Sequence, residues 1–197
     1  LARQAERQRE VEHRVKNTLQ LISSIVLLQS RRTGDESARQ ALKAVLQRVA
    51  AVSVAHRHVS WNENAEQVEV AALVREIVGD LAGSAGREDL AIDLDLEAIT
   101  IPGRQAAPVA LMISETVGNA LRHAFPDGRP GRVHVGVRRN GNGFEVSVGD
   151  DGVGEVESLP ATGFGLTVAQ LMAQQLRGRL ATEAAQPGLR FSEIGRA

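Results

Sequence analysis

The 197-residue chain contains no cysteine, and aromatic residues make up only 3% of it. The lack of cysteine excludes disulfides, thiolate nucleophiles and cysteine-ligated metals, and it favours a reducing compartment, so we expect a cytoplasmic protein. The scarcity of aromatic residues predicts an aliphatic core, for which an apolar share of 43% is ordinary. No apolar run reaches the roughly 18 to 20 residues that a membrane-spanning helix needs, so we expect no direct membrane contact.

The start of the chain, LARQAERQRE, has neither an initiator methionine nor the apolar core of a signal peptide. We therefore expect a fragment of a longer protein. Residues 1–60 carry 11 basic and 5 acidic residues, whereas residues 61–197 carry 12 basic and 19 acidic ones, which indicates two modules. The basic residues are scattered among apolar ones without interleaved aromatics, so nucleic acid is not an expected partner.

The N-terminal module is predicted to be a helical hairpin. Residues 4–32 contain no Gly or Pro, and their apolar positions recur every three or four residues, which predicts one amphipathic helix. Gly34 suits the end of that helix, and Asp35 suits the cap of the next. The second helix carries a heptad seam formed by Ala38, Leu42, Val45, Val49, Val52, His56 and Val59.

Two helices cannot cover such seams by themselves. We therefore expect a homodimer in which two hairpins, each formed by residues 1–62, pack as a four-helix bundle with twofold symmetry. A linker over residues 61–64 is expected to join this hairpin to a second domain, residues 63–197.

The second domain mixes helical and strand patterns. Helices are expected over residues 70–81, ended by Gly83, over 106–124 and from Gly163 to Leu176. Strands are expected over residues 90–96, 133–137, 144–148, 179–183 and 189–194, with a hairpin turn at 140–143. The order predicts an α+β fold, an α/β sandwich with its helices layered on one face of a mixed sheet.

The first candidate for chemistry is His13. It lies about 200° around the helix from Val11, so it faces away from the apolar stripe. A neutral imidazole, with a reference pKa of about 6.5, offers a nucleophilic nitrogen at pH 7. Glu10 and Asn17 share its face and could orient the ring or a water molecule. Taken alone, an exposed histidine on a charged helix is usually only a surface residue.

A second cluster follows on the helix over residues 106–124. Glu115 and Asn119 are one helical turn apart, and Arg122 and His123 follow one turn later. A carboxylate, an amide and a cation in a row suit Mg²⁺ and phosphate, since Mg²⁺ prefers oxygen ligands and keeps substrate phosphates and water in its shell. Without further context, a structural polar contact between helix and sheet explains the row equally well.

Two glycine-rich turns complete the set. Asp150 follows a strand and can accept a hydrogen bond from the amine of adenine, while Gly152 and Gly154 allow a close backbone approach. Residues 163–166, Gly-Phe-Gly-Leu, open a helix whose free N–H groups favour phosphate. Neither turn is a Walker loop or a Rossmann fingerprint.

The order and spacing of these four motifs resemble those of sensor histidine kinases over nearly the whole chain. The run His13-Arg14-Val15-Lys16-Asn17, the later Val54-Ala55-His56 and the run Asn119-Ala120-Leu121-Arg122-His123 are similar to the subgroup with a His-Arg-x-x-Asn acceptor box. The Trp-x-Glu motif of related kinases is absent. The resemblance implies a phosphoacceptor hairpin followed by a Bergerat-type ATP-binding domain.

The resemblance also implies a role for each motif residue. His13 would accept the phosphoryl group, Asn119 would bind Mg²⁺ with support from Glu115, and Asp150 would contact adenine. The remaining nucleotide-binding residues would be Arg122, His123, Gly152, Gly154, Gly163, Phe164, Gly165 and Leu166. Residues 155–162 would form a lid over ATP. An aspartate of a response regulator receiver domain would then take the phosphoryl group, and an upstream sensor domain, missing here, would control the reaction.

The chain departs from the usual motifs of such kinases at two places. Arg14 replaces the usual acid beside the acceptor, so either Glu10 or Glu12 could be the general base. Gly188-Leu189 stands where such kinases usually have Gly-Thr, which favours a weakened adenine site. Two alternatives to the kinase are a phosphotransfer or scaffold dimer that no longer uses ATP, and a regulator phosphatase in which Asn17 orients water.

Overall fold

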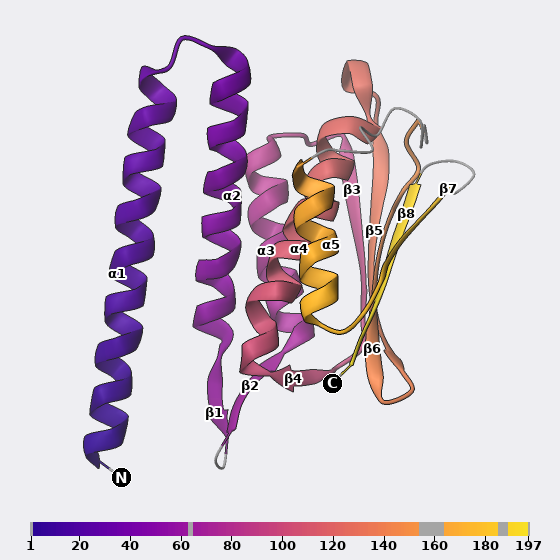
Figure 1. Ribbon diagram of the computed structural model, residues 1–197. Helices are drawn as coiled ribbons and strands as arrows, with labels where there is room; N and C mark the ends of the chain where they lie inside the picture. Colours follow the sequence, from indigo (N-terminus) through magenta and orange to yellow (C-terminus); the bar gives the residue numbers. More distant parts are fainter. Residues whose placement is uncertain (1, 63–64, 154–163, 185–188, 197) are drawn as a thin grey trace.

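The computed structural model describes residues 2–62, 65–153, 164–184 and 189–196. It is layered: a long helical hairpin lies on one side, three helices lie in the middle, and a five-stranded sheet lies on the other side (Figure 1). This arrangement confirms the predicted α+β fold, with an N-terminal hairpin and a mixed sheet covered by helices.

The hairpin consists of α1 (Ala2–Arg32) and α2 (Glu36–His58), joined by residues 33–35. Asp35 caps α2 as predicted, because its carboxylate accepts hydrogen bonds from the N–H groups of Ser37 at 2.8 Å and Ala38 at 3.3 Å. The buried residues of α2, Ala51, Val54 and Ala55, belong to the same hydrophobic core as the second domain. The hairpin is therefore packed onto the second domain through α2.

A small antiparallel sheet follows the hairpin. It is formed by β1 (Ser60–Asn62), β2 (Ala65–Glu69) and β4 (Thr100–Pro102), in the order β1-β2-β4. The prediction of a linker is wrong at Trp61 and Asn62, because the backbone of these two residues pairs with strand β2. The rest of that expected linker, residues 63–64, lies outside the described residues.

Three longer helices form the middle layer: α3 (Val70–Ala85), α4 (Ala106–Asn119) and α5 (Phe164–Gln175). The prediction that α3 ends at Gly83 is wrong. The helix continues through Gly83, and Gly86 ends it with a left-handed φ of 61°. After α4 the chain winds into a π-helix, Ala120–Ala124, so the predicted single helix over 106–124 changes type in its last turn. Two short 3₁₀ turns, Gly103–Gln105 and Pro126–Gly128, flank this unit.

The main sheet has the order β3-β5-β6-β8-β7. Its strands are β3 (Leu90–Leu96), β5 (Gly131–Asn140), β6 (Gly143–Asp150), β7 (Leu180–Ala184) and β8 (Leu189–Arg196). β3 pairs with β5 in parallel, and the other neighbours are antiparallel, so the sheet is mixed. Helices α3, α4 and α5 all lie on the same side of it (Figure 1).

The core lies between these helices and the sheet. Alternate residues of β5 and β6 face it, namely Val133, Val135, Val137, Phe144, Val146 and Val148. Their partners on α3 and α4 are almost all aliphatic, as the composition predicts. In the described part of the chain, no helix is long and apolar enough to cross a membrane.

Candidate functional site

The polar residues predicted on α4 lie at its C-terminal end, next to the hairpin. Glu115 is buried and Asn119 is half-buried. The π-helix that follows carries Arg122 and His123 at the surface. Short π-helical segments inside helices are often found at functional sites. The row of groups that the sequence predicted therefore exists, at a point where α4 changes its winding.

Glu115 forms a two-point ion pair with Arg48 of α2. Arg48 Nε lies 2.7 Å from Glu115 Oε1, and Arg48 Nη2 lies 3.1 Å from Glu115 Oε2. Only 17% of the arginine side chain and 5% of the carboxylate side chain are exposed. Arg48 was missed by the sequence analysis. The sequence feature that could have pointed to Arg48 is its position next to Val49 of the predicted heptad seam.

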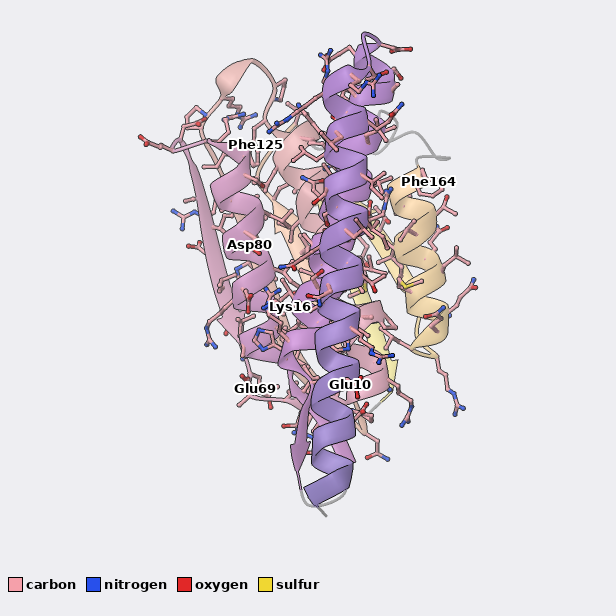
Figure 2. All side chains as sticks on the ribbon, turned by 90° about the vertical axis from the view of Figure 1, so that its left-hand side faces the viewer. Glu10, Lys16, Glu69, Asp80, Phe125 and Phe164 are labelled. Carbon is pink, nitrogen blue, oxygen red and sulfur yellow. The ribbon has the colours of Figure 1, made fainter. Side chains whose placement is uncertain are left out.

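Arg48 also reaches the start of α5. Its guanidinium carbon lies 4.7 Å from the centre of the Phe164 ring, which is within the range of a cation–π contact. Figure 2 shows Phe164 at the beginning of α5. Any side chain at Gly165 would collide with the Glu115 carboxylate. Phe164 and Gly165, predicted to contact phosphates, are thus beside the predicted metal ligand, and the absence of a side chain at Gly165 lets the backbone come close to it.

Arg122 connects Asn119 to the hairpin. Its Nη2 donates to Asn119 Oδ1 at 2.9 Å, and its Nη1 donates to Gln47 Oε1 of α2 at 2.9 Å. Partial burial of the guanidinium lowers the pKa of Arg122. The negative charge of Glu115 raises this pKa, and the positive charge of Arg48 lowers it. Partial burial, followed by the charge of Arg122, lowers the pKa of His123 below its ordinary value. Both effects favour the neutral form of the imidazole.

The predicted adenine-contacting turn is anchored to the end of the same helix. Asp150 is buried at the end of β6, and its carboxylate accepts a hydrogen bond from Gly152 N–H at 3.0 Å. Val153 N–H donates to the Ala124 carbonyl at 3.0 Å, so the turn is held against the last residue of the π-helix. Gly154 and Gly163, and the predicted lid between them, lie outside the described residues.

The acceptor residues lie on α1. His13 is on this helix, and its side chain is outside what the structure describes. Glu10 lies one turn earlier and forms an ion pair with Arg14 at 2.5 Å, while Asn17 is exposed. The side-chain bonds that join the hairpin to Glu115 and Arg122 come from Gln47 and Arg48 of α2.

The donor set fits a magnesium–nucleotide complex. A carboxylate and an amide oxygen on adjacent turns are hard oxygen ligands of the kind that Mg²⁺ takes, and Gly165 lets the backbone at the start of α5 lie close to both of them. The fold and the site together define a class of protein, one in which a nucleotide-binding sandwich is joined to a long helical hairpin.

The comparisons with known proteins identify this class. Residues 10–85 match the family described as histidine kinase, and residues 64–186 match the histidine kinase-like ATPase domain. The chain belongs to the family of histidine kinase-like ATPase domains, and together with the match of residues 10–85 this confirms the prediction of a sensor histidine kinase catalytic core.

Curated relatives agree with this assignment. The sensor histidine kinase PdtaS of Mycobacterium tuberculosis (strain CDC 1551 / Oshkosh) is 33% identical over 172 residues, which cover 85% of this chain and 33% of the relative. The blue-light-activated histidine kinase 2 of Erythrobacter litoralis (strain HTCC2594) is 27% identical over 174 residues, which cover 86% of this chain and 50% of the relative. The chain thus spans between a third and half of these relatives.

A solved structure shows the same fold. The histidine kinase domain of the EL346 blue-light-activated histidine kinase from Erythrobacter litoralis matches with a TM-score of 0.72 at 24% identity. The match covers 94% of this chain and 91% of that domain. The family matches and the names of the relatives support a histidine kinase and do not favour the phosphotransfer, scaffold and phosphatase alternatives.

Proposed function

We propose that the chain is the core of an ATP-dependent protein-histidine kinase that phosphorylates its own His13 and passes the phosphoryl group to an aspartate of a response regulator. One observation carries this proposal. Glu115, Asn119, Arg122, the Asp150–Gly152 turn and Gly165 come together around the end of one helix. The same chain supplies an acceptor-box helix, whose hairpin partner α2 contacts that site.

The residues around α4 would bind Mg·ATP. Asn119, supported by Glu115, would hold Mg²⁺, which offsets charge on the phosphoryl oxygens and aligns the phosphates when it is bound. Asp150 would accept a hydrogen bond from the adenine amine, with Gly152 and Gly154 shaping its pocket. Arg122, His123 and the residues at positions 163–166 would contact the phosphates. Catalysis would be mainly positioning and charge stabilisation, as is usual for phosphoryl transfer.

His13 would attack the γ-phosphorus in line and form a phosphorus–nitrogen bond as ADP leaves. The base that takes the imidazole proton belongs to the same helix in this proposal, with Glu10 and Glu12 as the candidates. Glu10 forms an exposed ion pair with Arg14 through its Oε1 atom. A positioned base contributes about 10²- to 10⁴-fold to a rate, so losing it would slow the reaction without abolishing it.

The proposed assembly is a homodimer in the cytoplasm. Large apolar side chains are exposed along α1, namely Leu21, Ile22, Ile25, Leu27 and Leu28. Such a stripe on a long helix is what a second hairpin would cover in a four-helix bundle. The response regulator and an upstream sensor domain are further proposed partners. Their support is the family to which the chain belongs.

Nucleotide binding tests the ATP half of this proposal. We expect calorimetry to detect Mg·ATP binding to the wild-type chain, and Asn119→Ala and Asp150→Asn each to weaken it at least about tenfold. Asn140→Ala, in the β5–β6 turn, is the matched control and should bind like the wild type. Equal affinity in all four proteins, or no binding by a folded wild type, would overturn the proposed ATP site.

A further inference from the structure

Both predicted metal-ligand oxygen groups are occupied by arginines that connect them to the hairpin. Arg48 of α2 covers both oxygens of Glu115. Arg122 occupies Asn119 Oδ1 and is itself held by Gln47 of α2. A cation such as Mg²⁺ cannot share these oxygens with two guanidinium groups at close range, because like charges repel. In this arrangement the same atoms bind either the hairpin or the metal.

The contact is specific as well as charged. Arg48 makes two parallel hydrogen bonds to the carboxylate and stacks over Phe164 at the start of α5. The pair is largely shielded from water, so solvent screens it little. Two-point arginine–carboxylate pairs are among the stronger hydrogen-bonded contacts in proteins. α2 is thereby fixed against both α4 and α5.

This docked arrangement places the nucleotide site away from the acceptor. Antiparallel pairing across the turn at residues 33–35 sets Arg48 about level with residue 20 of α1. His13 lies about seven residues further along α1, or about 10 Å at 1.5 Å per residue. Figure 2 agrees, because Phe164 lies well above the level of Glu10 and Lys16, which bracket His13 on α1. Within one chain, the Arg48 contact therefore lies about two helical turns away from the level of His13.

We propose that Arg48 and Gln47 form an autoinhibitory latch, which holds the nucleotide domain on α2 by occupying the groups that bind Mg·ATP. The latch rests on the proposed kinase function and adds a mode of regulation to it. Opening exchanges the Arg48 ion pair for magnesium coordination. Whatever shifts α2 relative to α4 would then set how much of the protein can bind nucleotide.

Competition makes a prediction about affinity. If only the unlatched fraction binds Mg·ATP, the apparent dissociation constant equals the intrinsic one divided by that fraction. Removing the latch should therefore tighten binding. If Arg48 only attracted the triphosphate through its positive charge, removing it would weaken nucleotide binding. The direction of the change in affinity therefore separates the latch from a simple charge effect.

The test measures binding of Mg²⁺ with a non-hydrolysable ATP analogue by calorimetry. Arg48→Met and Gln47→Ala should lower the dissociation constant, the first by about fivefold or more and the second by less. Arg39→Met is the matched control, since Arg39 is an arginine of the same helix that pairs with Glu36 away from the site. In EDTA the gain should disappear, because Glu115 and Asn119 reach the nucleotide through the metal.

A distance measurement reports the latch without relying on catalysis. The chain has no cysteine, so Lys43→Cys on α2 and Gln170→Cys on α5, both exposed, give one pair of spin labels per chain. With labelled chain diluted into an excess of unlabelled chain, so that a dimer carries only one labelled pair, we expect a single short distance in the free protein and a longer one after adding Mg²⁺ and analogue. Arg48→Met should raise the share of the longer distance without nucleotide, although the apolar contacts of α2 with the second domain remain, and Arg39→Met should not.

The outcomes separate the latch from the kinase. If Arg48→Met binds Mg-analogue no tighter than wild type and keeps the short distance, the latch is wrong, and the kinase proposal stands if wild type still binds. If Arg48→Met binds the Mg-analogue more tightly than wild type and shows more of the longer distance, the latch is supported and the wild-type chain is partly inhibited. If none of the folded proteins binds nucleotide, both proposals fail. An Arg48→Lys variant keeps the charge but loses the two-point geometry, so its dissociation constant should lie between those of wild type and Arg48→Met.

Discussion

Glycine 152 illustrates how single residues control the site. A methyl group added there would meet the Ala124 carbonyl oxygen and Ala124 Cβ, both too close for a real contact. The close approach is what allows the turn after β6 to sit on the end of the π-helix. Asp150 and the α4 residues are therefore brought together by the lack of a side chain at one position.

Gly152→Ala should lower the free energy of unfolding by about 1–3 kcal/mol, the usual cost of overpacking. Gly83→Ala is the matched control. Gly83 is helical, and an added methyl group would meet nothing within 4 Å, so alanine should stabilise the protein by about 0.5–1 kcal/mol. Urea unfolding measures both values. Equal and small changes in the two variants would contradict the packing described here.

His123 gives a prediction about pH. Its pKa in the folded protein is lowered, by burial first and then by Arg122, so the folded state binds a proton less readily than the unfolded state does. Stability should therefore be fully present above about pH 6.5 and should fall as the pH drops below that value. NMR titration should place the midpoint of His123 below 6.5. His123→Gln should remove this part of the pH dependence, whereas His134→Gln should keep it.

At this scale, the motif residues could be named from the sequence because their spacing is local. Glu115, Asn119 and Arg122 lie on successive turns of α4 and the π-helix that continues it. Asp150 ends a strand in which apolar and polar residues alternate clearly. Arg48 could not be assigned, because its partner Glu115 is 67 positions away and one sequence does not reveal long-range pairing.

At the scale of elements, the junction between α2 and α3 is held by charge. Glu76 of α3 accepts hydrogen bonds from Arg57 and His58, the last residues of α2, the His58 contact being 2.6 Å. The hydrogen bond from Arg57, followed by that from His58, lowers the pKa of Glu76. This cluster connects the end of α2 to α3.

Glu76→Gln should cost about 0.5–1 kcal/mol at pH 7, a modest value because the carboxylate is 37% exposed and partly screened. A lowered carboxyl pKa gives stability that is present above about pH 4.5 and is lost as the pH falls below it. The difference in unfolding free energy between wild type and Glu76→Gln, measured by urea unfolding, should thus shrink as the pH is lowered. Glu88→Gln, an exposed change in a turn, serves as the control. A gap that stays constant with pH would refute the assignment.

The elements themselves were predicted where the hydrophobic period was strong. Both long helices, α4, α5 and the β5–β6 hairpin follow from repeated apolar spacing. β4 was missed, because three residues are too few to show a period and its existence depends on pairing with β2. The end of α3 was placed three residues early, because Gly83 and Gly86 look alike in the sequence and only Gly86 takes a positive φ.

At the scale of the whole molecule, the exposed stripe on α1 requires a partner in the proposed assembly. Leu21 and Leu28 are 61% and 60% exposed, and they lie two turns apart on one side of the helix. Leu21→Glu with Leu28→Glu should convert a dimer into a monomer in sedimentation experiments. Leu171→Glu changes a leucine of α5 that is 51% exposed, and it should leave the mass unchanged. A wild type that sediments as a monomer would contradict the dimer proposal.

The order of domains was predictable because composition, charge and motif order all change near residue 61. How the two parts sit together was not, since it depends on the contacts of α2 with α4 and α5. Those contacts set the position of the nucleotide site relative to the hairpin that carries the acceptor helix.

The central claim is that His13 receives a phosphoryl group from ATP bound at Asn119. The most direct measurement incubates the chain with Mg²⁺ and γ-labelled ATP, beside His13→Ala and Asn119→Ala, and tests the protein-bound label for loss in acid. We predict an acid-labile label on the wild type and none on either folded variant, as expected for a phosphohistidine. An acid-stable label, or a label that persists in His13→Ala, would contradict the claim.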